Sequence, residues 1–219
     1  MEKINQFPSL DNQEISLEAI TKPPKLSGKL GKLDWPLEFR GGGKTTSEEN
    51  MRFEVKFPVG DIFLSYISTI HELGHLRQES LNPKLKNTSK THQVLYAQEV
   101  DAWERGWERF KRANPSLMAT LEEKFKTYKK QKKFTYNSFE DLYNWIKKNA
   151  LIIIEAQKIL FDESSKTKEE KMDDIADELE KNGIKQFFAE YKASRVGENV
   201  QESEIRQAIK NTIELIKKE

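Results

Sequence analysis

The chain has 219 residues, and its 37 lysine and arginine residues nearly balance 36 aspartate and glutamate residues, which leaves a formal net charge of +1. This balance gives no long-range field that would attract nucleic acid or a membrane surface. Cysteine is absent, which excludes disulfide bonds, thiolate nucleophiles and cysteine-ligated metals. No stretch is apolar enough for a membrane span, and the N-terminal residues lack the apolar core of a signal peptide. A cytoplasmic protein is therefore expected.

The N-terminal third is predicted to contain little regular structure. Residues 1–33 are polar and interrupted by prolines and glycines, which favours an irregular segment. Two runs of alternating apolar residues follow, WPLEF at residues 35–39 and MRFEVKF at residues 51–57, and they predict an antiparallel hairpin. The loop between them contains GGGKTT, but a phosphate-binding loop needs glycine where Glu38 stands. A flexible glycine turn is therefore predicted there.

From residue 61 onward the chain is predicted to be almost wholly helical. Asp61, Asn114 and Ser138 are residues that commonly cap helix N-termini, and each precedes an amphipathic stretch. Gly183 follows a further stretch in the position typical of a helix C-terminus. The first helix is expected at about residues 61–78 and the second at about residues 91–113. The expected fold class is α+β and predominantly α-helical.

Residues 70–76 read IHELGHL and place two histidines four positions apart on the first expected helix. On a helix that turns 100° per residue, His71 and His75 lie roughly 40° apart, so both imidazoles point to the same side. Two nitrogens in this arrangement can bind one Zn²⁺ ion, and Glu72 can reach water bound to it. The alternative is a chance match in a chain rich in helix.

A zinc ion needs a third protein ligand, and Glu99 is the best candidate. It stands at the centre of the apolar face of the second expected helix, where a carboxylate is costly unless it is paired or coordinated. Asp101 and Glu108 fall on the opposite, solvent-facing side and are rejected. The alternative for Glu99 is a buried salt bridge to a lysine or arginine.

Small residues on the two expected helices predict that the helices cross closely. Ala102 and Gly106 flank Glu99 on the apolar face of the second helix, and Gly74 faces the core from the first. A close crossing would bring the ligands on both helices within reach of one ion.

For other side chains near these positions, the sequence gives weaker support for a functional role. His92 is a rival third ligand, and His92 or Tyr96 could donate to a transition state, although a capping role and a core position are more common for such residues. Trp103 and Trp107 fit core positions better than a substrate platform.

HELGH, followed on the next expected helix by QEVDAW, resembles the zincin metallopeptidases, and within them the gluzincin-like group, in which a ligand glutamate lies on the second helix. The step from Glu99 to Ala102 is similar to the ImmA/IrrE-type branch. The resemblance covers roughly residues 35–112. It implies one zinc per chain, with His71, His75 and Glu99 as ligands and Glu72 as the general base.

Two departures define the resemblance further. The metzincin pattern is ruled out, because it needs glycine and histidine where Gln78 and Leu81 stand. Many gluzincins place aspartate four residues after the ligand glutamate, where this chain has Trp103. The predicted organisation is an irregular segment at residues 1–33, a zincin-like core at residues 34–130 and a helical extension at residues 131–219.

The expected function is a zinc metallopeptidase that hydrolyses peptide or protein substrates through a zinc-bound water activated by Glu72. An extended substrate could add as a strand along the hairpin. The alternative is a non-catalytic helical interaction protein with a structural or vestigial zinc site. The lysine run at residues 124–133 and the acidic segment at residues 162–180 fit solvated or mutually paired helix faces better than a nucleic-acid site. The sequence predicts no particular oligomeric state.

Overall fold

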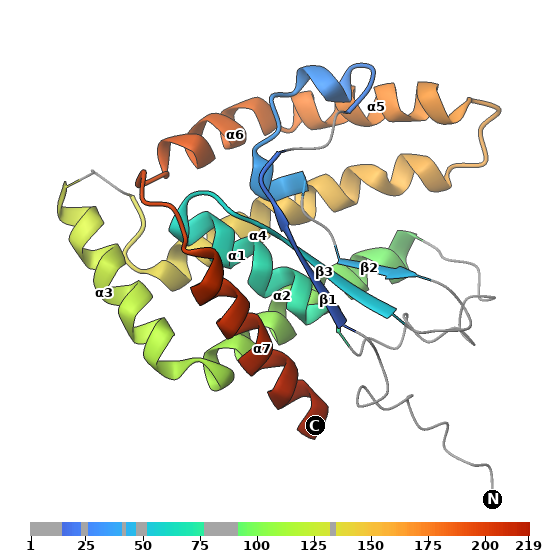
Figure 1. Cartoon of the computed structure of the whole chain (residues 1–219). Coiled ribbons are helices and arrows are strands. Elements are labelled where there is room, and N and C mark those ends of the chain that lie inside the picture. The colour runs from blue at the N-terminus through green and yellow to red at the C-terminus, as the bar shows by residue number, and fades with distance from the viewer. Residues whose placement is uncertain (1–14, 23–25, 41–42, 47–51, 77–91, 132–134) are drawn as a thin grey trace, which may run out of the picture.

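The computed structural model describes most of the chain as three strands and seven α-helices (Figure 1). The described residues are 15–22, 26–40, 43–46, 52–76, 92–131 and 135–219. None of the helices in these ranges combines the length and the apolar character that a membrane crossing requires. The prediction of a predominantly helical chain with a small sheet is confirmed.

The regular elements follow one another in a simple order. The strands are β1 (Ile15–Ile20), β2 (Gly43–Thr46) and β3 (Arg52–Pro58). The helices are α1 (Ile62–Gly74), α2 (His92–Ala113), α3 (Pro115–Gln131), α4 (Phe139–Ala156), α5 (Lys168–Lys181), α6 (Ile184–Ala193) and α7 (Glu202–Lys218). Short 3₁₀ turns lie at Leu30–Lys32, Leu37–Arg40 and Gln157–Phe161.

Helix α1 begins where the sequence predicts it. The Asp61 side chain accepts a hydrogen bond from the backbone N–H of Phe63 at 3.2 Å, which satisfies one of the unpaired donors of the first turn. The helix ends at Gly74, and His75 follows in a helical backbone conformation with φ −69° and ψ −18°. The predicted continuation of the helix to Gln78 is wrong for His75 and Leu76, which form a turn, and residues 77 and 78 lie outside the described residues.

The other predicted helix boundaries are also found. The Ser138 side chain caps α4 by accepting from the backbone N–H of Asp141, and Gly183 follows α5 with a positive φ of 76°. Asn114 stands at the start of α3, but its side chain does not cap that helix. Its amide donates instead to the hydroxyl of Thr212 at 3.0 Å, which links α2 and α3 to α7.

The sheet has the order β1-β3-β2 and is mixed rather than a simple hairpin. β1 runs parallel to β3 with Ile15 opposite Phe53, and β2 runs antiparallel to β3 with Gly43 opposite Val55. Two predictions are therefore wrong: β1 lies in the segment expected to be irregular, and β2 lies in the loop expected to be a flexible turn. Because β3 is paired on both sides, the outer edges of the sheet belong to β1 and β2.

The first strand of the predicted hairpin, residues 35–39, is also wrong. The backbone of this run forms no strand; residues 37–40 form a 3₁₀ turn, and aromatic side chains of the run contact α6. Trp35 packs on Phe188 and Phe39 packs on Tyr191, with ring centroids 5.0 and 4.9 Å apart. The alternation that predicted a strand arises because one side of a short turn faces aromatic rings.

One hydrophobic core joins the elements that carry the candidate site to those outside the family resemblance. Buried side chains of β3, α1, α2, α4 and α7 belong to a single cluster. α2 contacts α4 and α7, and α1 contacts α7. The predicted extension at residues 131–219 thus packs directly on the elements of the predicted core at residues 34–130. The boundaries at 33 and 130 stay predictions.

Candidate metal centre

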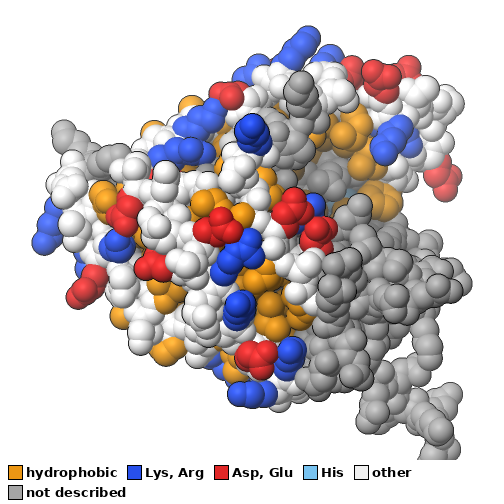
Figure 2. Space-filling view, viewed as in Figure 1, with side chains coloured by type: hydrophobic (Ala, Val, Ile, Leu, Met, Phe, Trp, Pro, Cys, Tyr) orange, Lys and Arg blue, Asp and Glu red, His pale blue; other side chains and the backbone are white. Residues whose placement is uncertain are grey.

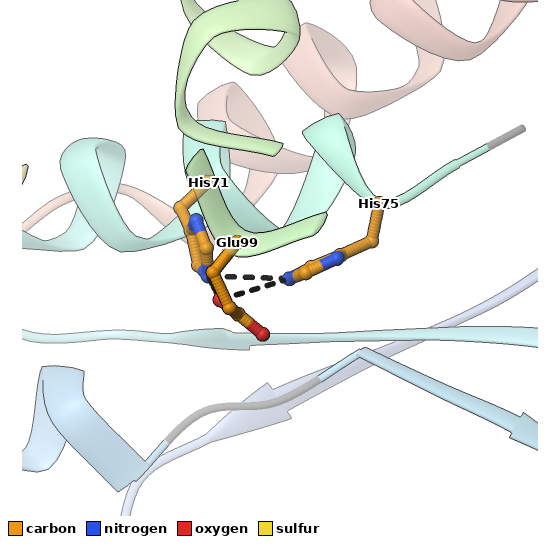
Figure 3. A group of neighbouring side chains, drawn as sticks. All are labelled: His71, His75 and Glu99. Carbon is orange, nitrogen blue, oxygen red and sulfur yellow. Dashed lines mark hydrogen bonds and ion pairs between the residues drawn. The ribbon is translucent and has the colours of Figure 1, made fainter. Parts of the chain in front are cut away.

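The two histidines of HELGH lie at the C-terminal end of α1 and point toward one another (Figure 3). Their Nε2 atoms are 3.2 Å apart, and their ring centroids are separated by 4.7 Å with an interplanar angle of 78°. The side chains are mostly buried, with 14% of His71 and 23% of His75 exposed. One nitrogen of each ring is therefore directed to the same point at the edge of the core.

Glu99 reaches the same point from α2. Its Oε2 atom lies 3.2 Å from Nε2 of His71 and 3.7 Å from Nε2 of His75. Each of the three residues offers one donor atom, and these atoms all lie within 4.8 Å of one another. Three ligands of a tetrahedral Zn²⁺ ion at about 2.0–2.1 Å are themselves about 3.3–3.4 Å apart. The donor set and its spacing therefore fit zinc.

Glu99 is not an ordinary surface carboxylate, because its surroundings bury most of the side chain. Its side chain is only 16% exposed. Burial by itself would raise the pKa of Glu99, but the hydrogen bond from His71 and the charges of His71 and His75 act in the opposite direction, so the pKa of this carboxyl lies below its ordinary value. The polar partners of Glu99 among the described residues are thus imidazoles, rather than the lysine or arginine of the alternative prediction.

The close crossing of α1 and α2 is what brings the ligands together. A Cβ atom added to Gly74 would lie 1.8 Å from the carbonyl oxygen of Ala102, and one added to Gly106 would lie 2.0 Å from the carbonyl oxygen of Ile70. Neither distance is sterically possible, so both positions require glycine at this separation of the helices. The predicted role of the small residues is confirmed.

Trp103 supports the ring of His71, a role that the sequence did not indicate. The indole is 4% exposed and stacks on the imidazole with centroids 4.3 Å apart and an interplanar angle of 27°. Tyr143 of α4 donates a hydrogen bond to the carbonyl oxygen of Trp103. An aromatic residue one helical turn after Glu99, on the same face, is the signal that could have suggested this contact.

Glu72 lines the same cavity as the three candidate ligands. Its side chain is buried, and the cavity has a volume of about 690 Å³. The expected catalytic carboxylate therefore lines the same space as the donor set, and this space is large enough for an organic ligand.

His92 and Tyr96 lie elsewhere, and neither lines that cavity. Nε2 of His92 donates to the carbonyl oxygen of Ile154 at 3.0 Å. Tyr96 lines a separate shallow cleft together with Glu155. The structure does not bring these two candidates to the donor set.

The rejected acidic residues lie on the outer face of α2, as predicted. Asp101 has 38% of its side chain exposed and forms an ion pair with Arg105 at 2.7 Å, and Glu108 is exposed. Neither can contribute to a buried metal centre on the opposite face of the helix.

Members of both charged runs form ion pairs, and among the described residues none of these pairs joins one run to the other. Lys124 contacts Glu198 at 2.5 Å. In the acidic segment Asp177 pairs with Lys29 and Asp174 pairs with Lys166. Lys132 and Lys133 lie outside the described residues. On the face drawn in Figure 2, acidic and basic side chains of the described residues are interspersed.

Searches against protein-family models, curated protein sequences and solved structures find no match for this chain. The class of the site therefore rests on its residues and their geometry.

Proposed function

We propose that this protein is a zinc-dependent metallopeptidase whose metal is held by His71, His75 and Glu99. The observation that carries the proposal is the convergence of three donor atoms from two crossing helices at distances of 3.2, 3.2 and 3.7 Å. This donor set, two imidazole nitrogens and one carboxylate oxygen, is typical of catalytic zinc.

The surroundings of the donor set favour a catalytic site over a structural one. Structural zinc sites are closed by four protein ligands, whereas catalytic sites keep one position for water or substrate. Here three residues converge among the described part of the chain. They also line a cavity of about 690 Å³, so a substrate could approach the fourth position.

The residues of the chain have separable roles in this proposal. A zinc ion in the site would supply a Lewis acid that lowers the pKa of water and polarises a carbonyl group. Glu72 accepts the proton of the attacking water at its carboxylate and delivers it to the leaving amine. Trp103 holds the imidazole of His71 in the orientation that its ligand nitrogen needs. The outer edge of β2 is where an extended peptide could add as a strand, because the β1 carbonyl of Leu17 already accepts a hydrogen bond from Arg206 of α7.

The test compares the wild type with two variants, Glu72→Gln and Glu108→Gln. Each protein is loaded with zinc and incubated with a mixture of unstructured peptides, and mass spectrometry detects the products. Glu72→Gln should retain zinc and lose hydrolysis by about 100-fold or more, because it removes the proton acceptor. Glu108→Gln, an exposed change on α2, is the matched control and should hydrolyse at the wild-type rate.

Wild-type rates in the Glu72→Gln protein would reject the peptidase. Zinc binding without hydrolysis in the wild type would support the alternative, a non-catalytic helical protein with a structural zinc site.

A further inference from the structure

The cavity beside the candidate metal centre has two chemically different ends. The polar end is formed by α1 and α2, where the three candidate ligands and Glu72 lie. The other walls are mainly apolar and come from α4, α5 and the segment at residues 26–39. Figure 2 shows hydrophobic side chains gathered below α5. A ligand that fills this space must therefore present a polar group to the metal centre and an apolar body to the remaining walls.

We propose that this cavity is a specificity pocket that takes a bulky apolar side chain, such as phenylalanine or leucine, next to the scissile bond of a peptide. The inference rests on the proposed function and names its substrate class. It also assigns a role to α4 and α5, which lie outside the part of the chain that resembles zincins.

Helices α4 and α5 form two of the walls through residues at helical spacing. On α4 the lining positions Ile146, Ala150 and Ile153 recur every three or four residues, and on α5 the positions Met172, Ile175 and Leu179 do the same. Both helices thus direct an apolar stripe into the cavity. Five of these six side chains are buried and Met172 is half-buried, so the stripes form the inner wall of the cavity and Met172 lies nearer to solvent.

The segment at residues 26–39 forms a further wall and is fixed to α5 by charge. The Lys29 ammonium pairs with Asp177 at 2.8 Å, and its backbone N–H donates to Asp173 at 3.1 Å. Leu26 at the start of this segment lines the cavity but is 38% exposed. The wall is therefore held in place, and Leu26 stands where the cavity meets solvent.

The size of the cavity suits this class of ligand. Pockets for drug-sized ligands have volumes of about 300–1,000 Å³, and the value here is about 690 Å³, so the cavity has room for a bulky side chain together with the adjoining peptide backbone. Burying one leucine or phenylalanine side chain in an apolar pocket strengthens binding by about tenfold or more. Among the described residues that line the cavity, the one lysine or arginine is Lys168, which is exposed. Acidic and basic substrate side chains therefore find no buried partner of opposite charge in the described part of the apolar walls.

The test uses blocked peptides N-acetyl-Gly-Gly-X-Gly-Gly-amide, in which X is phenylalanine, leucine, glycine or lysine. Hydrolysis is measured with the zinc-loaded wild type, and binding is measured by calorimetry with the zinc-loaded Glu72→Gln protein, which separates recognition from chemistry. The phenylalanine and leucine peptides should be hydrolysed and bound at least about tenfold better than the glycine and lysine peptides.

Three substitutions then locate the pocket. Met172→Glu on α5 should abolish the preference for apolar X, whereas Met172→Leu should keep it. Leu26→Glu changes a partly exposed position, so the fold tolerates it, and it should weaken the preference in the same direction.

The outcomes separate the two proposals. Equal rates and equal binding for all four peptides, or an unchanged preference in both glutamate variants, would overturn the pocket while leaving the peptidase intact. Preferential binding of the phenylalanine peptide without hydrolysis by any protein would overturn the peptidase and support the pocket.

Discussion

The indole of Trp103 lies flat on the imidazole of His71, with ring centroids 4.3 Å apart. Metal-bound histidines usually donate their second ring N–H to a carboxylate or carbonyl group, which fixes the ring. The buried Nδ1 atom of His71 has no such hydrogen-bond partner among the described residues. Stacking on Trp103 is therefore the contact that would orient this ring in the proposed metal centre.

Removing this stacking should weaken metal binding. Trp103→Ala is expected to lower zinc affinity by about 10–100-fold, the usual effect of losing a group that orients a ligand. Trp103→Phe keeps an aromatic face against His71 and should lose much less. Competition with a chromophoric chelator measures the affinities.

Trp107→Ala is the control for this experiment. Trp107 is buried one turn further along α2 and packs on Tyr143 rather than on His71. Both alanine variants should lose about 3–5 kcal/mol of unfolding free energy. Equal losses of zinc affinity in the two variants would show that Trp103 acts only through stability.

Substituting a glycine at the crossing of α1 and α2 should reduce the unfolding free energy and the zinc affinity more than substituting a glycine elsewhere. Gly106→Ala places a methyl group 2.0 Å from the carbonyl oxygen of Ile70 and should separate α1 from α2, at a cost of about 2–3 kcal/mol in unfolding free energy and with loss of zinc affinity. Gly183→Ala meets nothing within 4 Å and should cost only about 1 kcal/mol, from its positive φ, with zinc affinity unchanged. Chemical denaturation and chelator competition measure both quantities. A Gly106→Ala protein with wild-type zinc affinity would contradict the crossing as the device that joins the ligands.

Asp61 makes the stability of the fold depend on pH in a defined direction. Its carboxylate is 3% exposed and accepts hydrogen bonds from the backbone N–H groups of Val196 and Gly197. Burial raises the pKa of Asp61 above its ordinary value of 3.8, although these hydrogen bonds oppose the effect. A raised pKa in the folded state means that stability is fully present below the unfolded pKa and falls as the pH rises through the folded pKa.

The measurement compares the unfolding free energies of wild type and Asp61→Asn, determined by chemical denaturation between about pH 3 and pH 7. The unfolding free energy of the wild type, relative to the neutral asparagine variant, should decrease as the pH rises above 3.8 and then level off. A difference that instead grows with pH would show that the hydrogen bonds, and not burial, dominate at this position.

Zinc should stabilise the folded chain. A ligand that binds only the folded state at a free concentration of 100 times its Kd adds about 2.7 kcal/mol to the unfolding free energy. Thermal unfolding with and without zinc measures this gain, which Glu99→Gln should largely remove. A gain of the same size in that variant would place the zinc elsewhere in the chain.

Helical periodicity predicted the candidate site well because its residues depend on local geometry. His71 and His75 lie on one face of a helix by their spacing alone, and Glu99 was identified by its place on an apolar face. The small residues that permit the crossing, such as Gly106, could also be read from the sequence. These predictions need only the period of an α-helix and the cost of a buried carboxylate.

The sheet and the cavity could not be predicted in the same way. β1 pairs in parallel with β3 across a long stretch of chain, and Phe39 packs on helix α6 rather than in a strand. Such contacts depend on segments distant in sequence, which local alternation does not record. The cavity arises where α4, α5 and residues 26–39 meet, so no single segment contains its signal.

The zinc content of purified protein tests the central claim most directly. Metal analysis of wild type, Glu99→Ala and Asp101→Ala should find about one zinc per chain in the wild type and in the Asp101→Ala control, because Asp101 lies on the outer face of α2 and pairs with Arg105. The Glu99→Ala protein should retain little zinc after dialysis. A wild type without zinc, or a Glu99→Ala protein that binds zinc as tightly as the wild type, would contradict the account.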